Sequence, residues 1–443
     1  MLFRLANGEA PYPSTYTAPE HNPTLITNAT VLTGDGKRLE GASVYFVNGK
    51  IVEVTDSAPE VAANTRVIDG QGRWVTPGVI DVHSHLGVYP SPDVDAHSDG
   101  NEATAPVTAE VWAEHSIWPQ DPGFGRALAG GVTTLQILPG SANLFGGRAV
   151  TLKNVASVSY QGMKFPGAPY GLKMACGENP KRVYGRKGSG PSTRMGNIAG
   201  YRTAWIKAQD YRDEHAQYAA LTREEQKETT RPKRDLELET LAGVLDGEII
   251  IHMHCYRADE MLTILDLAKE FDYKVGTFHH GVEAYKIADE LAENDVCGAL
   301  WADWWGFKME AYDGIQENIA LVDRPDGSCA VVHSDSDEGI QRLNQEAAKA
   351  MSRGVKAGLD IPPERAITWI TSNAAKSLGI EDKTGTLAAG KMADVVLWSG
   401  NPFSVYTKPD HVFIDGVHRY DRLNPELQPV SDFELGQLLE AGE

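Results

Sequence analysis

The distribution of apolar and polar positions divides the chain into a helix-rich middle and two β-rich ends. Between about residues 76 and 378, short apolar runs alternate with segments such as ADEMLTILDLAKEF and EAYKIADELAEN, which carry apolar residues at helical spacing. The runs are GVIDVHSH, GVTTLQIL, GLKMACGEN, EIIIHMHC, KVGTFHHG, VCGALWA and CAVVHSDS. Strands that alternate with helices form parallel βαβ units, and this many units predict an α/β fold, a (β/α)8 TIM-type barrel over residues 76–378.

The two ends of the chain share a different pattern. Residues 24–75 and 379–425 consist of short strand-like runs separated by turn pairs such as Asn48-Gly49. We therefore predict one small β-sandwich domain built from both ends of the chain and attached to the barrel. Residues 1–23 are expected to form an N-terminal arm, and residues 426–443 a C-terminal tail.

Composition narrows the classes of partner. Of the 443 residues, 61 are acidic and 41 basic, which gives a formal net charge of −20. This balance argues against nucleic acid or an anionic membrane as a partner, because both require a basic surface. No apolar stretch approaches the roughly 18 residues of a membrane span. We expect a soluble protein with a small-molecule substrate, cytoplasmic as the sequence stands or periplasmic if a leader was trimmed. The sequence is also compatible with a homo-oligomer.

The cysteines carry no motif. Cys176, Cys255, Cys297 and Cys329 are widely spaced and form no CxxC pair. We expect free thiols or small buried apolar side chains and no disulfide framework.

Candidate chemistry gathers at the ends of the predicted strands. His83 and His85 end the first strand and share a face, because side chains two positions apart in a strand point the same way. Imidazole and carboxylate groups are the ligands that zinc and similar ions take from proteins. One such residue is commonly structural, but several at the ends of successive strands predict a divalent metal site. The candidates are His83, His85, Glu178, His254, His280 and Asp335.

Several motifs resemble the amidohydrolase superfamily, whose members are metal-dependent hydrolases on a (β/α)8 barrel. PGVIDVHSH resembles its first-strand HxH signature, and ITSNAAKSLGI followed by GTLAAGKMADVVLW resembles its closing helix and return to the β-domain. The likeness extends from about residue 24 to 420. GENPKRVYG, HCYRADE, HHGVEAYKIADEL and HSDS look most like the imidazolonepropionase-related group, near the prolidase-like dipeptidases.

The resemblance implies a role for each candidate ligand. His83 and His85 would bind one metal, with zinc the first expectation, and His254 and His280 would bind a second ion or share the first. Asp335 would ligate and also act as general base and acid. His254 is preferred to His252 because the family motif runs from its histidine into a helix-starting pattern, and here that motif, HCYRADE, begins at His254.

His280 is preferred to His279 because the family's histidine at this point is followed directly by a small residue, here Gly281. His252 and His279 would then support the ligands or pack. The bridging ligand has two candidates: many relatives use a carbamylated lysine, here Lys173, and others a glutamate, here Glu178. The two differ in parity and cannot both face the metal from a regular strand; Glu178 is favoured because it falls where the strand should end.

The implied activity is hydrolysis of a C–N bond in a dipeptide, an N-acyl amino acid or a cyclic amide. Tyr256 and Arg257, just after His254, are candidate substrate-binding residues, although Arg257 could instead pair with Asp259. Two alternatives remain. The same centre could act as a lactone or ester hydrolase or as a deaminase, or the barrel could be a non-catalytic metal-binding scaffold.

Overall fold

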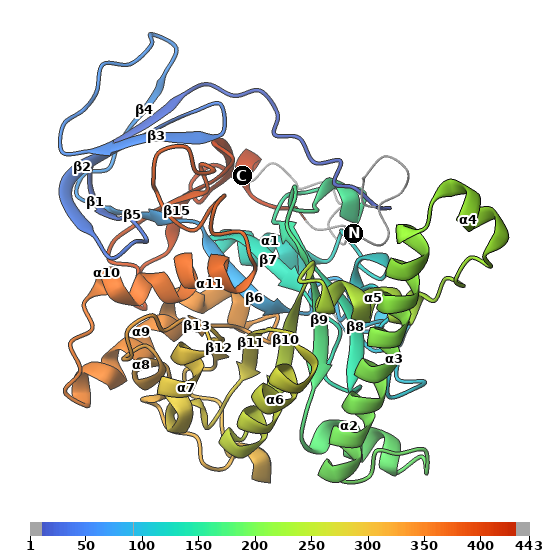
Figure 1. Ribbon diagram of the computed structural model, residues 1–443. Coiled ribbons are helices and arrows are strands. Elements are labelled where there is room, and N and C mark those ends of the chain that lie inside the picture. The colour runs from blue at the N-terminus through green and yellow to red at the C-terminus, as the bar shows by residue number, and fades with distance from the viewer. Residues whose placement is uncertain (1–10, 92, 431–443) are drawn as a thin grey trace.

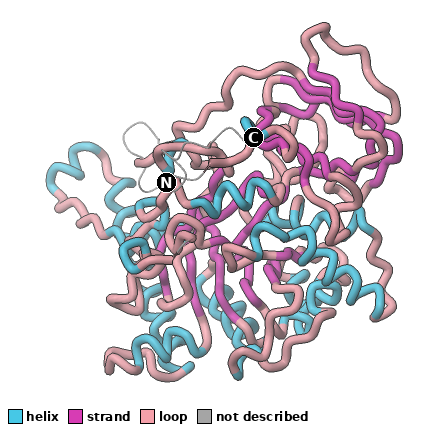
Figure 2. The backbone as a smooth tube through the Cα atoms, turned by 180° about the vertical axis from the view of Figure 1, so that it is seen from behind, coloured by secondary structure: helices cyan, strands magenta, loops and turns pink. Residues whose placement is uncertain are grey.

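The computed structural model describes residues 11–91 and 93–430, and residues 1–10 of the predicted arm and 431–443 of the predicted tail lie outside them. An eight-stranded barrel occupies the middle of the chain, with helices around it (Figures 1 and 2). Its strands are β6 (Val79–Ser84), β7 (Val132–Ile137), β8 (Phe145–Lys153), β9 (Tyr170–Ala175), β10 (Ile249–Cys255), β11 (Val275–His280), β12 (Cys297–Leu300) and β13 (Ala330–Val332). The predicted barrel is confirmed.

One barrel strand runs against the others. β8 pairs antiparallel with both β7 and β9, whereas the remaining neighbouring pairs from β6 to β13 are parallel. The sequence pattern does not predict this strand, because its opening FGGR is typical of a glycine-rich loop. The link from β8 to β9 consequently lies at the opposite end of the barrel from the links that follow parallel strands.

The two ends of the strand series meet through side-chain and backbone hydrogen bonds. The carboxylate of Asp81 on β6 accepts hydrogen bonds from the backbone N–H of Ser334 at 3.2 Å and from the Ser334 hydroxyl. The N–H of Asp335 donates to the carbonyl of His83 at 3.0 Å. These contacts join β6 to the residues just after β13, at the carboxyl ends of both strands.

The β-domain is built from both chain ends, as predicted, and it appears in Figure 1 as blue and red strands together. In its sheet the C-terminal strand β14 pairs antiparallel with the N-terminal strand β5. The strands are β1 (Thr24–Leu32), β2 (Arg38–Val47), β3 (Lys50–Thr55), β4 (Arg66–Asp69), β5 (Trp74–Pro77), β14 (Val395–Trp398), β15 (Pro409–Ile414) and β16 (Val417–Asp421).

A buried ion cluster connects the barrel to the β-domain. The Nζ atom of Lys153, at the end of β8, lies 2.7 Å from Asp415 Oδ2 and 3.2 Å from Asp394 Oδ1. Lys153 is fully buried. Because an ammonium group is buried only at a cost unless it is paired, the two carboxylates fix the position of this strand end.

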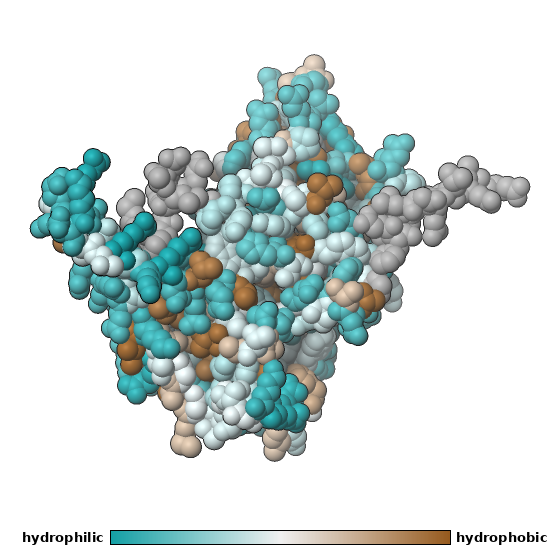
Figure 3. Space-filling model, turned by 90° about the vertical axis from the view of Figure 1, so that its right-hand side faces the viewer, coloured by the Kyte–Doolittle hydropathy of each residue, from teal (hydrophilic) through white to brown (hydrophobic). Residues whose placement is uncertain are grey.

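Most of the helices surround the barrel, and one short helix, α4, projects away from it (Figure 1). The helices are α1 (Pro122–Ala129), α2 (Glu178–Gly185), α3 (Arg194–Ala220), α4 (Arg223–Glu228), α5 (Leu236–Leu245), α6 (Ala258–Phe271), α7 (Ala288–Glu293), α8 (Asn318–Val322), α9 (Leu343–Lys356), α10 (Pro363–Ala366) and α11 (Ser372–Ser377). On the side of α3 to α5, hydrophilic residues dominate the surface (Figure 3). Among the described residues, none of the helices combines the length and the apolar character needed to cross a bilayer.

The cysteine expectation was wrong. Cys176 is disulfide-bonded to Cys255, with Cα atoms 5.2 Å apart, and Cys297 to Cys329, with Cα atoms 4.5 Å apart. Each disulfide joins neighbouring strands or the residues flanking them, β9 to β10 and β12 to β13. Adjacent strands lie close enough for such bonds, although the partners are 79 and 32 positions apart in sequence.

Candidate metal centre

The carboxyl ends of the barrel strands bring three predicted histidines around the carboxylate of Asp335. Asp335 Oδ1 lies 3.2 Å from His85 Nε2 and 3.5 Å from His83 Nε2, and its Oδ2 lies 3.8 Å from His280 Nδ1. His83 and His280 are buried, whereas His85 is partly exposed. Residues from the first, sixth and eighth barrel strands therefore converge on Asp335.

Two of these residues have unusual backbone conformations. His280 has φ of 73° and Asp335 has φ of 50°, in the left-handed region that residues other than glycine seldom adopt. His279 and His280 are consecutive, so a regular strand would turn them to opposite faces. The left-handed conformation at the end of β11 allows His280 to approach the centre together with His279.

His254 and His333 complete the ring of imidazoles. The His254 ring centroid lies 4.6 Å from that of His280, and His333 stacks on His83 with centroids 5.1 Å apart. His333 was not identified by sequence analysis. The signal was present, because His333 directly follows a buried strand and precedes Asp335 by two positions, the same spacing as in the pair His83 and His85.

A chain of hydrogen-bonded side chains supports His83 from within the barrel. His83 Nδ1 lies 2.8 Å from His279 Nδ1, and His279 Nε2 lies 2.9 Å from His252 Nδ1. His252 Nε2 in turn lies 3.2 Å from Gln136 Nε2. Since both ring nitrogens of His252 and of His279 are engaged, these two residues orient His83 and leave its Nε2 facing Asp335.

The two candidates for the bridging position lie in different surroundings. Lys173 is fully buried on β9, and its Nζ lies 3.3 Å from His83 Nε2. Glu178 is the first residue of α2, is partly exposed, and has its carboxylate 3.5 Å from Lys308 Nζ. The structure therefore brings Lys173 into contact with the histidines and places Glu178 against Lys308.

Burial shifts the pKa values of the side chains in the candidate metal centre. It lowers the pKa of His252 and of His333 to about 3, and that of Lys173 to about 8. Burial acts to raise the pKa of Asp335, but the hydrogen bond from His85 and nearby positive charges hold that pKa below its usual value. The buried imidazoles of His252 and His333 thus favour the neutral form and Asp335 the ionised form, the protonation states that a metal requires of such ligands.

The donor atoms fit a divalent cation. Nitrogens of His83, His280 and His333 lie within 4.8 Å of one another, as do donor atoms of His83, His85 and Asp335. Nδ1 of His254 and of His280 and both ring nitrogens of His333 are buried without a hydrogen-bond partner. Such orphaned nitrogens are costly unless something binds them. A mixture of imidazole and carboxylate ligands suits zinc and related ions.

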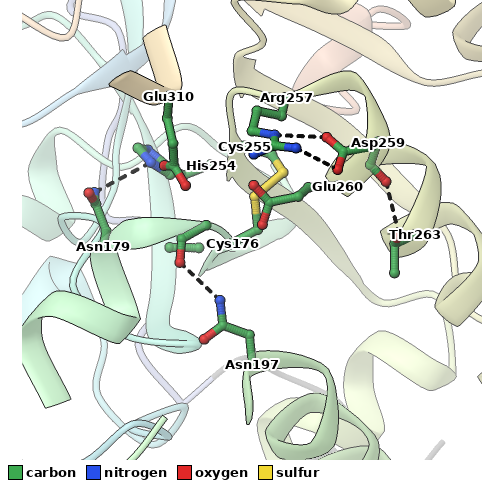
Figure 4. Close-up of a disulfide and its surroundings, with 12 residues drawn as sticks. Cys176, Asn179, Asn197, His254, Cys255, Arg257, Asp259, Glu260, Thr263 and Glu310 are labelled. Carbon is green, nitrogen blue, oxygen red and sulfur yellow. Dashed lines mark hydrogen bonds and ion pairs between the residues drawn. A yellow bond between two sulfur atoms is a disulfide. The ribbon is translucent and has the colours of Figure 1, made fainter. Parts of the chain in front are cut away.

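The predicted substrate-binding residues separate. The ring of Tyr256 is buried beside the centre, 4.7 Å from the His254 ring, and Lys308 Nζ lies 4.1 Å from its centroid. Arg257 instead pairs with Asp259 through two contacts of 2.9 Å, across the disulfide from His254 (Figure 4).

An aromatic wall, which we define as Tyr256, Trp301, Trp304 and Phe307, borders the centre on one side. Trp301 stacks on His280 with centroids 4.3 Å apart, and it contacts Trp304 and Phe307 at 5.5 and 5.9 Å. Trp304 and Phe307 are exposed. The wall therefore offers an apolar surface that extends from the metal-binding side chains to solvent.

Two cavities reach the group from solvent. One of about 270 Å³ is bounded by His85, Tyr89, Asp93 and Asp335. The other, of about 810 Å³, includes His333 and Trp301 in its lining. Both Asp335 and the aromatic wall are thus within reach of a small molecule.

Known proteins resemble this chain in sequence and in fold. A family model described as the amidohydrolase family matches residues 326–418. The crystal structure of an amidohydrolase from Thermotoga maritima MSB8 is 36% identical and matches 90% of this chain and 100% of that chain, with a TM-score of 0.81. The chain belongs to the amidohydrolase family.

Two related proteins match most of this chain in sequence. The amidohydrolase tasK of Hapsidospora irregularis is 32% identical over 436 residues, but the match covers 90% of this chain and only 43% of tasK. The imidazolonepropionase of Chromobacterium violaceum is 25% identical over 406 residues, covering 85% of this chain and 91% of that protein. The resemblance predicted from the motifs is confirmed.

Proposed function

We propose that this amidohydrolase is a metal-dependent hydrolase that cleaves a C–N bond of a small amide, with Asp335 as general base and acid. The observation that carries the proposal is the position of Asp335, whose carboxylate faces His83, His85 and His280 at 3.2–3.8 Å. A carboxylate at the metal-binding side chains is placed to move protons to and from a reacting water.

The proposed ligands are His83, His85, His254, His280 and Asp335, with His333 as a further candidate and Lys173, carbamylated on Nζ, preferred to Glu178 at the bridging position. Lys173 forms its carbamate by adding CO2 to the neutral amine with loss of a proton, and its lowered pKa favours the neutral amine. One or two divalent ions, with zinc the first choice, would activate water and polarise the substrate carbonyl.

The chain's own residues account for the proton transfers. Asp335 takes a proton from water as the water oxygen bonds to the carbonyl carbon. The C–N bond then breaks, and Asp335 delivers the proton to the leaving nitrogen, so that an acid and an amine depart. The hydrogen bonds from His252 through His279 to His83 keep the His83 ring oriented during both proton transfers.

Substrate contacts are proposed for Tyr256 and Lys308. The ammonium group of Lys308 lies beside Tyr256 and 3.0 Å from Asn179 Oδ1, at the rim of the centre. Together they could bind an anionic group of the substrate, while the aromatic wall packs against an apolar one. Lys308 takes this role in place of Arg257, because its ammonium group lies over the ring of Tyr256 beside the centre, whereas both guanidinium contacts of Arg257 go to Asp259.

Activity measurements test the proposal. Protein loaded with zinc is incubated with dipeptides, N-acyl amino acids, cyclic amides, lactones and amino-substituted rings, and chelator-treated protein is the control. We expect turnover of at least one amide that disappears with the metal and returns when zinc is restored.

Two results would contradict the proposal. Turnover confined to lactones or to release of ammonia would assign the centre to the ester-hydrolase or deaminase alternative. Stoichiometric zinc binding without turnover of any of these compounds would favour the non-catalytic scaffold.

A further inference from the structure

A second group of metal-binding side chains lies in the β-domain, outside the barrel centre. His411 is on β15, and His418 and Asp421 are on the following strand, β16. Their donor atoms all lie within 4.8 Å of one another. None of the three belongs to the barrel, so the proposed hydrolysis makes no use of them.

The distances within this group match those between ligands of one small cation. His411 Nδ1 lies 3.1 Å from His418 Nε2 and 3.4 Å from Asp421 Oδ2. Zinc bonds to nitrogen and oxygen ligands are about 2.0–2.2 Å long, so neighbouring donors of a tetrahedral zinc ion are about 3.3 Å apart. Little rearrangement of the hairpin is needed for these atoms to share an ion.

Neighbouring groups hold the ligands in this arrangement. Asp421 Oδ1 accepts a hydrogen bond from the N–H of Leu423 at 3.0 Å, which leaves Oδ2 directed at His411. The ring of Phe413 stacks on His418, with centroids 4.8 Å apart. The side chains of His411 and Asp421 are 16% and 15% exposed, so an ion from solvent can reach them.

Arg66 would compete with a bound cation for His418. Its Nη1 lies 2.7 Å from His418 Nδ1, so it donates to that nitrogen and leaves the ring proton on Nε2. A cation at Nε2 would displace this proton, and the ring would then carry its proton on Nδ1. Arg66 would therefore have to withdraw. Its side chain is exposed and belongs to another strand, β4, so it can do so.

We propose that His411, His418 and Asp421 form a second divalent metal site, with water as the fourth ligand and Arg66 competing with the ion for His418. Zinc or another ion that accepts two imidazoles and a carboxylate fits the donor set. The ion would fasten β15 to β16, at the edge of the sheet that holds the two chain ends together.

Metal stoichiometry and thermal stability test this site. Metal-free full-length protein is saturated with zinc, passed over a desalting column, and assayed for bound zinc and for the rise in melting temperature. We expect wild-type protein to retain one zinc more per chain than Asp421→Asn and His411→Ala, and both variants to lose part of the zinc-dependent rise. Asp421→Asn preserves the shape of the side chain, so its fold should persist. His97→Ala removes a partly exposed histidine elsewhere and should match wild type.

Arg66→Gln provides an independent variant. Removal of the competing cation should lower the dissociation constant of this zinc ion several-fold. The proposal is overturned if wild-type, Asp421→Asn and His411→Ala proteins bind equal amounts of zinc with the same rise in melting temperature. A barrel centre without metal would not affect this outcome, because only the difference between variants is compared.

Discussion

At the scale of single residues, the proposed role of Asp335 in proton transfer gives the most specific prediction. Asp335→Asn keeps an oxygen near His83 and His85 but cannot accept and return a proton. We expect the variant to retain bound metal while turnover falls roughly 10²–10⁴-fold, the range typical of a lost general base. Metal analysis and steady-state rates on the same preparation measure both properties.

The nearby residue Asp337 is the matched control, because it also borders the smaller cavity but makes no ion pair with the histidines among the described contacts. Asp337→Asn should keep most of the activity. Near wild-type turnover in Asp335→Asn would show that another group moves the proton.

Lys173 and Glu178 can be separated by their variants. If Lys173 is the bridging ligand, Lys173→Met should lower metal affinity by at least roughly 10–100-fold. Added propionate should restore part of the activity, because its carboxylate can occupy the space left by the carbamate. Glu178→Gln should change metal content little, since Glu178 faces Lys308. Metal titration of both variants gives the comparison, and loss of metal from Glu178→Gln alone would reverse the assignment.

The sequence predicted most of this centre because strand ends are readable from local pattern. The spacing of His83 and His85 predicted a shared face, and Asp335 followed a buried run. The preference for His254 and His280 over His252 and His279 came from motif resemblance, and the hydrogen bonds of His252 and His279 favour it. The contact of Lys173 with His83 could not be predicted, because a lysine inside a strand has no local signal of what it contacts across the barrel.

At the scale of elements, the two disulfides offer a paired comparison. Cys176–Cys255 lies next to His254 (Figure 4), whereas Cys297 is the first residue of β12 and Cys329 directly precedes β13. Replacing either pair with serine should destabilise the protein by about 2–4 kcal/mol. Only loss of Cys176–Cys255 should also lower activity, because it tethers the loop before α2 to the residue after His254.

Urea unfolding and turnover of both double variants check this expectation. Equal losses of activity in the two variants would show that the effect is general destabilisation rather than displacement of His254. The disulfides could not be predicted from the sequence, because strand adjacency, not spacing along the chain, brings each pair together.

The strand β8 was not predicted for a local reason: the glycines at its start hide the alternation of polar and apolar residues that follows in RAVTLK.

At the scale of the whole molecule, buried histidines should make the metal-free protein sensitive to acid. The fold lowers the pKa of His83, His252, His254, His279, His280 and His333, so the unfolded chain takes up protons that the folded chain refuses. Their contribution is complete above the ordinary histidine pKa of about 6.5 and is lost as the pH falls below it. For His252 alone the loss between pH 7 and 5 is on the order of 2 kcal/mol.

Asp81 works in the opposite direction. Burial raises its pKa to about 7, so its protonation favours the folded state as the pH falls. One carboxyl group offsets about one histidine, and the net expectation is a clear loss of stability from pH 7 to 5. Urea unfolding of chelator-treated protein at the two pH values measures it. Equal stability at both would mean that the histidines are already charged in the fold.

Because β8 runs in the opposite direction to the other barrel strands, attachment of the β-domain and choice of substrate depend on opposite ends of the barrel. The last residue of β8, Lys153, pairs with the carboxylates of Asp394 and Asp415, and residues 154–169 then connect β8 to the neighbouring strand β9. Insertions in that connection would loosen the attachment of the β-domain and leave the choice of substrate intact. New specificities would have to arise elsewhere, chiefly in the long links 86–121 and 301–317, which follow the carboxyl ends of β6 and β12.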